Sequence, residues 1–295
     1  MPKPIKNAEA HKARRAKLSA VFPGEVLVIP TGHEKVRAND TNYRFRPGTE
    51  FFYLTGNEEA DCVLVLQPVK GGHEHVLYVE PNPGRSDSTF FTDRHKGELW
   101  VGPRLGVPES EKRFGVDRCA PISELGAYLK KAVKGGKKFR ALRGVSAELD
   151  KLLPKQKNKD SDLAIQLSEM RLHKDKAEVA TLVRACKVTR KAFDDVVRCL
   201  KTAKNEREVE GAFNARARLE GNDAGYNVIA AAGANACILH WGRNDGRIKK
   251  NDLVLLDAGV ELNDLYTADI TRTIPSSGKF TATQRVVYDL VRDAQ

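Results

Sequence analysis

The stretch LLDAGVELNDLYTADITRTIP, residues 255–275, carries acidic side chains within an otherwise strand-like sequence. Apolar runs with strand-like composition predict two β-strands, over residues 252–260 and 265–274. The polar cluster between them, ELND, is typical of a turn. The stretch therefore predicts a β-hairpin with a carboxylate on each arm.

The placement of these two carboxylates raises an electrostatic problem. If the hairpin is centred on Asn263, Asp257 and Asp269 face each other directly across it, with Cβ atoms about 4.5–5.5 Å apart. Like charges in that position destabilise a sheet, and the apolar run before Asp257 is expected to bury its carboxylate, which adds a further cost. A shared proton, a basic side chain or a bound cation must offset this cost. Carboxylate oxygens suit Mn²⁺, Mg²⁺ or Ca²⁺, and one carboxylate can bridge two ions.

Helical patterns precede this hairpin and one follows it. Apolar residues at helical spacing predict two consecutive helices within residues 169–201, the first of them opened by Lys174 and Asp175, and a third over residues 206–219. After the hairpin, residues 281–294 predict a helix with Thr281 as its N-cap. Helices followed by a hairpin favour an α+β domain.

The N-terminal half alternates strand-like and helix-like segments, which favours an α/β domain. The predicted strands cover residues 25–30, 50–55, 61–66 and 75–79, and the predicted helices cover residues 97–100 and 123–132. The lysine-rich sequence around Pro154 interrupts the pattern. We therefore predict a first domain over residues 1–160 and a second over residues 161–295.

Composition limits the compartment and the partners. The 295 residues contain five cysteines and no CxxC pair, which favours a reducing cytoplasm over a disulfide framework or a zinc–thiolate site. No apolar run is long enough for a membrane span, and the basic N-terminus has no apolar core of an export signal. The net charge of +11 raises nucleic acid as a partner. However, the basic clusters lack interleaved aromatic residues, so nucleic acid is not the favoured partner.

His240 follows the apolar residues of ACILHWG, shortly before the hairpin. A histidine in such a context can be a satisfied core residue. It can also bind substrate or transfer a proton, because it precedes the two carboxylates so closely. The residues themselves leave both interpretations open.

Several longer motifs resemble aminopeptidase P, the Xaa-Pro aminopeptidases of the pita-bread metallopeptidase family. In the second half they are SEMRLHKDKAEVATLVRAC, YNVIAAAGANACILHW and LVLLDAG…TADITRTIPSSGKFTATQRVVYDLV. In the first half they are YRFRPGTEFFYLTG, DCVLVL, and ELWVGPRLG with FGVDR. The resemblance implies an N-terminal α/β domain followed by the first half of a pita-bread domain. The N-terminal motifs favour aminopeptidase P over the shorter methionine aminopeptidases.

The resemblance implies a role for individual residues. Asp257 matches the family's first metal carboxylate, and Asp269 matches the aspartate that bridges both metal ions. His240 matches a histidine near the substrate. Trp100 matches a tryptophan that in some members reaches the active site of a neighbouring subunit, which implies a homo-oligomer. Tyr226 lies in the family's YN(x)I segment, and we expect it to be structural.

The resemblance also implies an activity and its cofactor. Members hold a hydroxide on two manganese ions and release the N-terminal residue from peptides with proline in second position. The family's remaining ligands, a histidine and two glutamates, lie beyond the DITRT motif, and no residue of this chain can be assigned to them. We therefore expect the 295-residue chain to be inactive by itself. Prolidase, which cleaves only dipeptides, and a non-catalytic pita-bread binding module are the alternatives.

Overall fold

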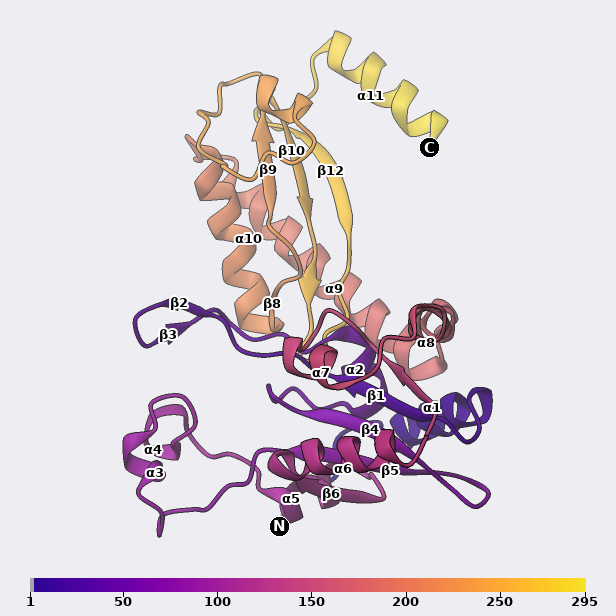
Figure 1. The fold of residues 1–295 in the computed structure, drawn as a ribbon. Coiled ribbons are helices and arrows are strands. Elements are labelled where there is room, and N and C mark those ends of the chain that lie inside the picture. Colours follow the sequence, from indigo (N-terminus) through magenta and orange to yellow (C-terminus); the bar gives the residue numbers. More distant parts are fainter. Residues whose placement is uncertain (1–2) are drawn as a thin grey trace. The chain divides into compact units, whose positions relative to one another are not determined.

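The computed structural model describes residues 3–295, which form two compact units. The first unit ends at His173, and the second comprises Lys174–Gln295. Each unit has its own hydrophobic core and is described by itself (Figure 1). Among the described residues, no helix is both long and apolar enough to cross a lipid bilayer.

A mixed five-stranded sheet forms the centre of the first unit, in the order β6-β5-β4-β1-β7. The central pairs β1–β4 and β4–β5 are antiparallel, while the outer pairs β1–β7 and β5–β6 are parallel. The strands are β1 (Val26–Pro30), β4 (Val63–Val69), β5 (Gly72–Val79), β6 (Arg118–Pro121) and β7 (Phe139–Ala141).

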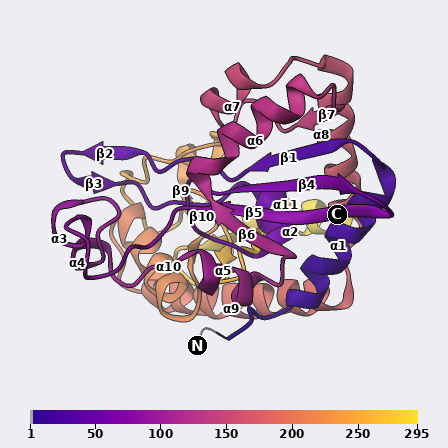
Figure 2. The ribbon, with the colours of Figure 1, turned by 60° about the horizontal axis from the view of Figure 1, so that its bottom comes forward.

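Helices cover both faces of this sheet, because its strands are apolar on both sides. In β1, Leu27 and Ile29 point into one core, whereas Val26 and Val28 point into the other. The helices on the first face are α1 (Ala8–Val21), α2 (Thr49–Thr55), α5 (Val107–Phe114) and α8 (Lys157–Leu172). On the opposite face lie α6 (Ile122–Lys134) and α7 (Ala147–Leu152) (Figure 2). The predicted α/β class of this half is confirmed.

One predicted strand is wrong: residues 50–55 lie in helix α2. The sequence EFFYLT is rich in aromatic residues, as strands often are, yet Phe51 and Leu54 are spaced by three and are both fully buried. Gly48 precedes the helix, and Gly56 ends it with a φ of 66°. A short apolar run is compatible with either structure, and here packing against the sheet selects the helix.

Two segments extend from the same side of the first unit (Figures 1 and 2). One is a hairpin of β2 (Val36–Ala38) and β3 (Thr41–Asn42). The other, residues 82–106, contains α3 (Thr89–Thr92) and α4 (Glu98–Val101). Trp100 lies in α4, as the predicted helix over residues 97–100 indicates.

The first unit extends beyond the predicted boundary at residue 160. Helix α8 follows the lysine-rich break, and its residues Leu163, Leu167 and Met170 are buried in the core of the first unit. Tyr53 of α2 also donates a hydrogen bond to the carbonyl of Met170 at 3.0 Å. The polar sequence around Pro154 is thus a loop within the first unit, and the compact units divide after His173.

The second unit packs helices on one face of an antiparallel three-stranded sheet of order β12-β10-β9 (Figure 1). The strands of the second unit are β8 (Asp223–Ala224), β9 (Ile229–Ala232), β10 (Leu253–Ala258), β11 (Val260–Glu261) and β12 (Ile270–Pro275), and β8 and β11 form a separate two-stranded sheet. Its helices are α9 (Lys176–Cys199), α10 (Glu206–Glu220), the 3₁₀ turn η1 (Gly233–Cys237) and α11 (Ala282–Ala294). The expected α+β arrangement is confirmed.

Capping boxes begin the three long helices of this unit. The N-caps Asp175, Asn205 and Thr281 each accept a hydrogen bond from the third helical residue, whose side chain accepts one in return. Such reciprocal caps satisfy two backbone donors that a helix start leaves unpaired. This explains why local sequence located these helix starts well.

The second sheet has one covered face and one open face. Val254, Leu256 and Ala258 of β10 are fully buried against α9 and α10. The alternate residues Leu255 and Asp257 point the other way and are only partly buried. The helices therefore leave the face that carries Asp257 accessible.

A buried histidine makes the stability of the first unit depend on pH. His75 on β5 is 8% exposed, and burial, assisted by the charge of Arg15, lowers its pKa to about 4 although Asp117 opposes the shift. Between pH 6.5 and 4 the unfolded chain binds a proton that the folded chain does not. The contribution of His75 to the unfolding free energy is therefore fully present above about pH 6.5 and is lost as the pH falls towards 4.

We expect this histidine to account for a loss of up to about 3 kcal/mol in unfolding free energy. Urea unfolding at pH 7.5 and pH 4.5 measures it, with His75→Leu as the comparison. The part of the pH dependence due to His75 is the difference between the two proteins. Equal pH dependence in both proteins would show that His75 is not the group responsible.

Candidate metal site

The hairpin brings Asp257 and Asp269 onto one face of the sheet, but not directly opposite each other. Asp257 pairs with Thr271, and Ala258 pairs with Ile270, so the ladder is centred on Asp264. The predicted centre was one residue earlier, which shifts the pairing by two residues. A shift of two preserves the face, because side chains alternate with a period of two. The two carboxylates are therefore diagonal neighbours.

The turn geometry explains this register. Leu265 adopts a left-handed conformation with a φ of 61°. Its backbone N–H bonds to the carbonyl of Leu262 at 2.8 Å, and the N–H of Leu262 bonds to the carbonyl of Tyr266 at 3.0 Å. Composition located this turn, but its backbone conformation sets the register.

Gly259 allows the two arms to approach closely beside the carboxylates. A Cβ atom at this position would lie 1.5 Å from the carbonyl oxygen of Ala268, the residue before Asp269. No side chain fits there unless the backbone moves. The glycine of the DAG motif thus determines where Asp269 lies relative to Asp257.

Tyr226 joins the two carboxylates. Its phenol oxygen lies 2.7 Å from Oδ1 of Asp257 and 3.0 Å from Oδ1 of Asp269. The backbone N–H of Gly225 bonds to the carbonyl of Gly259 at 2.8 Å, which fixes the tyrosine beside the hairpin. A Cβ atom on Gly225 would lie 2.1 Å from the side chain of Thr267, so this contact also requires a glycine.

The phenol of Tyr226 is a proton donor in this site. Burial, followed by the hydrogen bonds to Asp257 and Asp269, raises its pKa above the usual range. Its single proton serves both carboxylates. In the described part of the chain neither aspartate forms an ion pair with a basic side chain, and the group that lies between the two carboxylates is the neutral hydroxyl of Tyr226.

The site is more open than the sequence predicts. Asp257 is half-buried and Asp269 is exposed, although the apolar run before Asp257 predicts a buried carboxylate. The helices cover the other face of the sheet, so β10 buries its alternate residues instead. The carboxylate pair is therefore accessible to a ligand.

Both aspartates are suited to a divalent cation as part of a ligand set. Their oxygens are hard donors that converge around one hydroxyl on the open face. In residues 3–295 no group of three or more histidine, cysteine, aspartate or glutamate side chains is arranged to hold a metal ion. Two carboxylates alone bind such an ion weakly, since a stable site needs more ligands.

His240 lies in the same unit, in the loop that follows η1, and it is exposed. Within the described residues no hydrogen bond or ion pair joins its imidazole to Asp257 or Asp269. The interpretation of His240 as a core residue is therefore wrong. An exposed imidazole is available to substrate.

Trp100 lies in the first unit, at the end of the projecting segment of residues 82–106. The indole is 50% exposed, its Nε1–H donates to the carbonyl of Phe91 at 2.8 Å, and Arg94 stacks over the ring. Leu99 and Val101 beside it are exposed as well. The segment thus presents an apolar tip to solvent.

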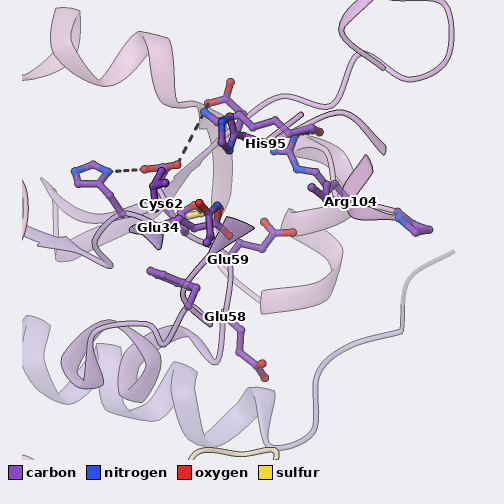
Figure 3. Close-up of a pocket in the computed structure, with 16 residues that line it drawn as sticks. Glu34, Glu58, Glu59, Cys62, His95 and Arg104 are labelled. Carbon is purple, nitrogen blue, oxygen red and sulfur yellow. Dashed lines mark hydrogen bonds and ion pairs between the residues drawn. The ribbon is translucent and has the colours of Figure 1, made fainter. Parts of the chain in front are cut away.

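A hollow of about 560 Å³ lies where this segment joins the first unit, and charged side chains surround it (Figure 3). Lys96 on its wall forms ion pairs with Glu80 at 3.3 Å and with Asp61 at 3.9 Å. Arg104 donates to the carbonyl of Lys96 at 2.9 Å. These bonds fasten the base of the segment that carries Trp100.

Sequence reasoning missed the part played by Tyr226. It lies three residues before β9, and Ile229 of β9 pairs with Asp257. The signal in the sequence is a tyrosine shortly before a strand that pairs with the strand of Asp257. This signal can be interpreted only when the pairing of these two strands, which are distant in the chain, is known.

Family models match both halves of the chain. The model described as "Aminopeptidase P, N-terminal domain" matches residues 11–140, and "Metallopeptidase family M24" matches residues 180–295. The two halves of the chain thus match a two-part metallopeptidase architecture.

Relatives and solved structures agree with these matches. The chain is 46% identical to Xaa-Pro aminopeptidase 1 of Streptomyces coelicolor, over 99% of this chain and 59% of that protein. It is 32% identical to Xaa-Pro aminopeptidase of Escherichia coli, over 98% of this chain and 67% of that protein. The structure of aminopeptidase P from E. coli superposes with a TM-score of 0.84 at 30% identity, over 98% of this chain and 67% of that one. The chain belongs to the aminopeptidase P family, and it spans about three-fifths of the first of these relatives.

Proposed function

We propose that this chain is part of a metal-dependent Xaa-Pro aminopeptidase, which releases the N-terminal residue from peptides with proline in second position. The observation that carries the proposal is the convergence of Asp257 and Asp269 on one phenol at the open face of the sheet. The similarity to proteins named Xaa-Pro aminopeptidase over almost the whole chain supports the same activity.

Asp257 and Asp269 would contribute ligands to two divalent ions, which we propose to be manganese, with Asp269 bridging them. Such ions supply a hydroxide nucleophile at neutral pH and stabilise the developing oxyanion. Tyr226 would hold the side chains of the two carboxylates in position through its hydroxyl group. His240, exposed and free of contacts with the carboxylates, would contact the substrate during turnover.

Trp100 supports a proposal about assembly. Its exposed apolar tip would bind at the active site of a neighbouring copy and help to enclose the substrate. We therefore propose a homo-oligomer that acts in the cytoplasm on peptides. The expected mass in solution is a multiple of the protomer mass. Trp100→Ala should raise KM for peptides and leave the fold of the protomer unchanged.

Substrate length separates this function from that of a prolidase. The complete protein that contains this chain, supplied with Mn²⁺, should cleave the tripeptide Arg-Pro-Pro after arginine. Turnover of Gly-Pro with no turnover of Arg-Pro-Pro would indicate a prolidase instead. If the complete protein binds no divalent metal by elemental analysis, a non-catalytic binding module becomes the better interpretation.

Tyr226→Phe tests how the carboxylates are held. The variant loses the one proton that both aspartates share, so their repulsion is no longer relieved without metal. We expect the metal-free protein to unfold about 1–2 kcal/mol more easily, as for loss of hydrogen bonds to charged groups. We also expect about 10–100-fold weaker metal binding, the usual cost of losing an outer partner of a ligand.

Thermal unfolding with chelator and calorimetric titration with Mn²⁺ measure the two effects of Tyr226→Phe. Tyr288→Phe is a matched control, because Tyr288 lies on α11 and its ring packs against that of Phe280. Unchanged metal affinity in Tyr226→Phe would show that the phenol does not orient the ligands.

A further inference from the structure

The loop that carries His240 has few anchors. It leaves β9 through η1 and returns along the edge of β9 at Asn244, whose side chain bonds to the N–H of Ala230 and the carbonyl of Val228. Apart from the bond from the N–H of Ile238 to the carbonyl of Asn235 in η1, residues 238–242 form one hydrogen bond to another element within the described chain. That bond runs from Nε1–H of Trp241 to Glu206 at 2.7 Å.

Glu206 receives four donors with its two carboxylate oxygens. Oε1 accepts from the N–H of Ala232 at 2.7 Å and from the amide of Asn235 at 2.9 Å. Oε2 accepts from the indole of Trp241 at 2.7 Å and from the N–H of Gly246 at 2.8 Å. One carboxylate thus binds the start, the middle and the end of the loop.

This carboxylate is buried without a counter-charge. Glu206 is 0% exposed and takes part in none of the ion pairs of the described residues. Burial by itself raises its pKa, but the four hydrogen bonds outweigh burial, and the net pKa is lowered, so the group stays ionised. An ionised buried group is costly unless its oxygens are satisfied, so these donors and the carboxylate constrain one another.

The position of Glu206 at the start of helix α10 makes these hydrogen bonds to the loop rigid. It is the first residue of α10, directly after the N-cap Asn205. Its own backbone N–H donates to the carbonyl of Gly246 at 3.0 Å, so loop and helix bond in both directions. Further along the same helix, Val209 and Phe213 are buried in the core of the second unit. The loop is therefore held by a fixed element.

We propose that Glu206 is a positioning residue for His240: its buried carboxylate fixes Trp241 and thereby orients the adjacent imidazole towards the substrate. The inference rests on the proposed function of His240, but the anchoring of the loop can be tested apart from activity. Glu206 itself does not contact the substrate.

The first test is spectroscopic and follows the indole N–H groups of Trp100 and Trp241 in the complete protein. The ¹H–¹⁵N indole region should show one peak for each, and Trp100→Phe and Trp241→Phe assign them. The Trp241 peak should lie downfield, as expected for a charge-assisted bond. In Glu206→Gln this peak should move upfield and its proton should exchange faster with deuterium, since the amide is neutral and cannot accept from all four donors. The Trp100 peak should stay in place.

The second test is kinetic and uses the complete protein with Mn²⁺. Glu206→Gln should lower kcat for Arg-Pro-Pro by about a hundredfold, the cost of a small misplacement of a reacting group, with less change in KM. His240→Ala should lower it by at least as much. In the double variant the two losses should not multiply, because Glu206 acts through His240. Trp241→Phe removes the anchoring donor and should reproduce the loss even if Glu206→Gln folds poorly.

The matched control is Glu208→Gln, the same change two residues further along α10. Glu208 accepts only from the backbone at the helix start and does not reach the loop, so neither the indole peak nor kcat should change. An unmoved Trp241 peak in Glu206→Gln, or losses that multiply fully with His240→Ala, would overturn the proposal. Full activity of His240→Ala would instead refute the role proposed for His240, while the indole shift would still report the anchor.

Discussion

Asp269→Asn is expected to abolish turnover of Arg-Pro-Pro by the complete protein. An amide in place of the proposed bridging carboxylate removes the charge that neutralises two divalent ions. The loss should exceed the roughly 10–100-fold that follows removal of an outer partner of a ligand. Steady-state kinetics with added Mn²⁺, together with metal analysis of the purified variant, measure the effect.

The fold of this variant should survive. Without metal, Asp257 and Asp269 repel each other and share one phenol proton, and an asparagine can still accept that hydrogen bond. The melting temperature with chelator should therefore equal or exceed that of the wild type. Asp289→Asn is the control, since Asp289 lies on α11 and pairs only with Arg285 and Arg292 there. Normal turnover by Asp269→Asn would show that the bridging assignment is wrong.

Gly259→Ala is expected to have the second largest effect. The added methyl group would lie 1.5 Å from the carbonyl oxygen of Ala268, so the arm that carries Asp269 must move. We expect a loss of about 1–3 kcal/mol in unfolding free energy, typical of overpacking. We also expect weaker metal binding and a loss of kcat, because displacement of Asp269 separates it from Tyr226 and Asp257.

Gly211→Ala is the control for this prediction. Gly211 lies within α10, and a Cβ atom there would meet nothing within 4 Å. Alanine should therefore be neutral or should stabilise the helix by up to about 1 kcal/mol. Urea unfolding and calorimetric titration with Mn²⁺ compare the two variants. If Gly259→Ala binds the metal as the wild type does, the close approach of the two arms does not set the position of Asp269.

Local sequence predicted most of the secondary structure. The capped helices and the apolar strands follow from patterns of neighbouring residues, and α10, β1 and β5 lie close to their predicted ranges. The prediction of two consecutive helices after Asp175 is wrong, because residues 176–199 form one continuous helix, α9. The failure at residues 50–55 has a physical cause: a run of four aromatic and apolar residues suits a strand and a buried helix equally well. Contacts with the sheet and Gly56 decided between them.

The candidate site could likewise be predicted from the sequence only in part. Asp257 and Asp269 could be singled out from the sequence, because a carboxylate that follows an apolar strand and faces a second one is expected to require compensation. Their diagonal register could not be predicted, since it depends on the left-handed conformation of one turn residue, Leu265. The same applies to the accessibility of the site, which depends on the face that α9 and α10 cover.

The sequence by itself determined most of the elements, the hairpin and the chemistry of its two acidic residues, because each of these depends on residues close together in the chain. Tertiary structure alone decided that the hydroxyl of Tyr226 would join both aspartates and that Glu206 would hold the loop of His240. The contact of Tyr226 with Asp257 links positions 31 residues apart, and that of Glu206 with Trp241 links positions 35 residues apart. Their geometry depends on how strands pair and how a helix packs, and no local pattern contains that information.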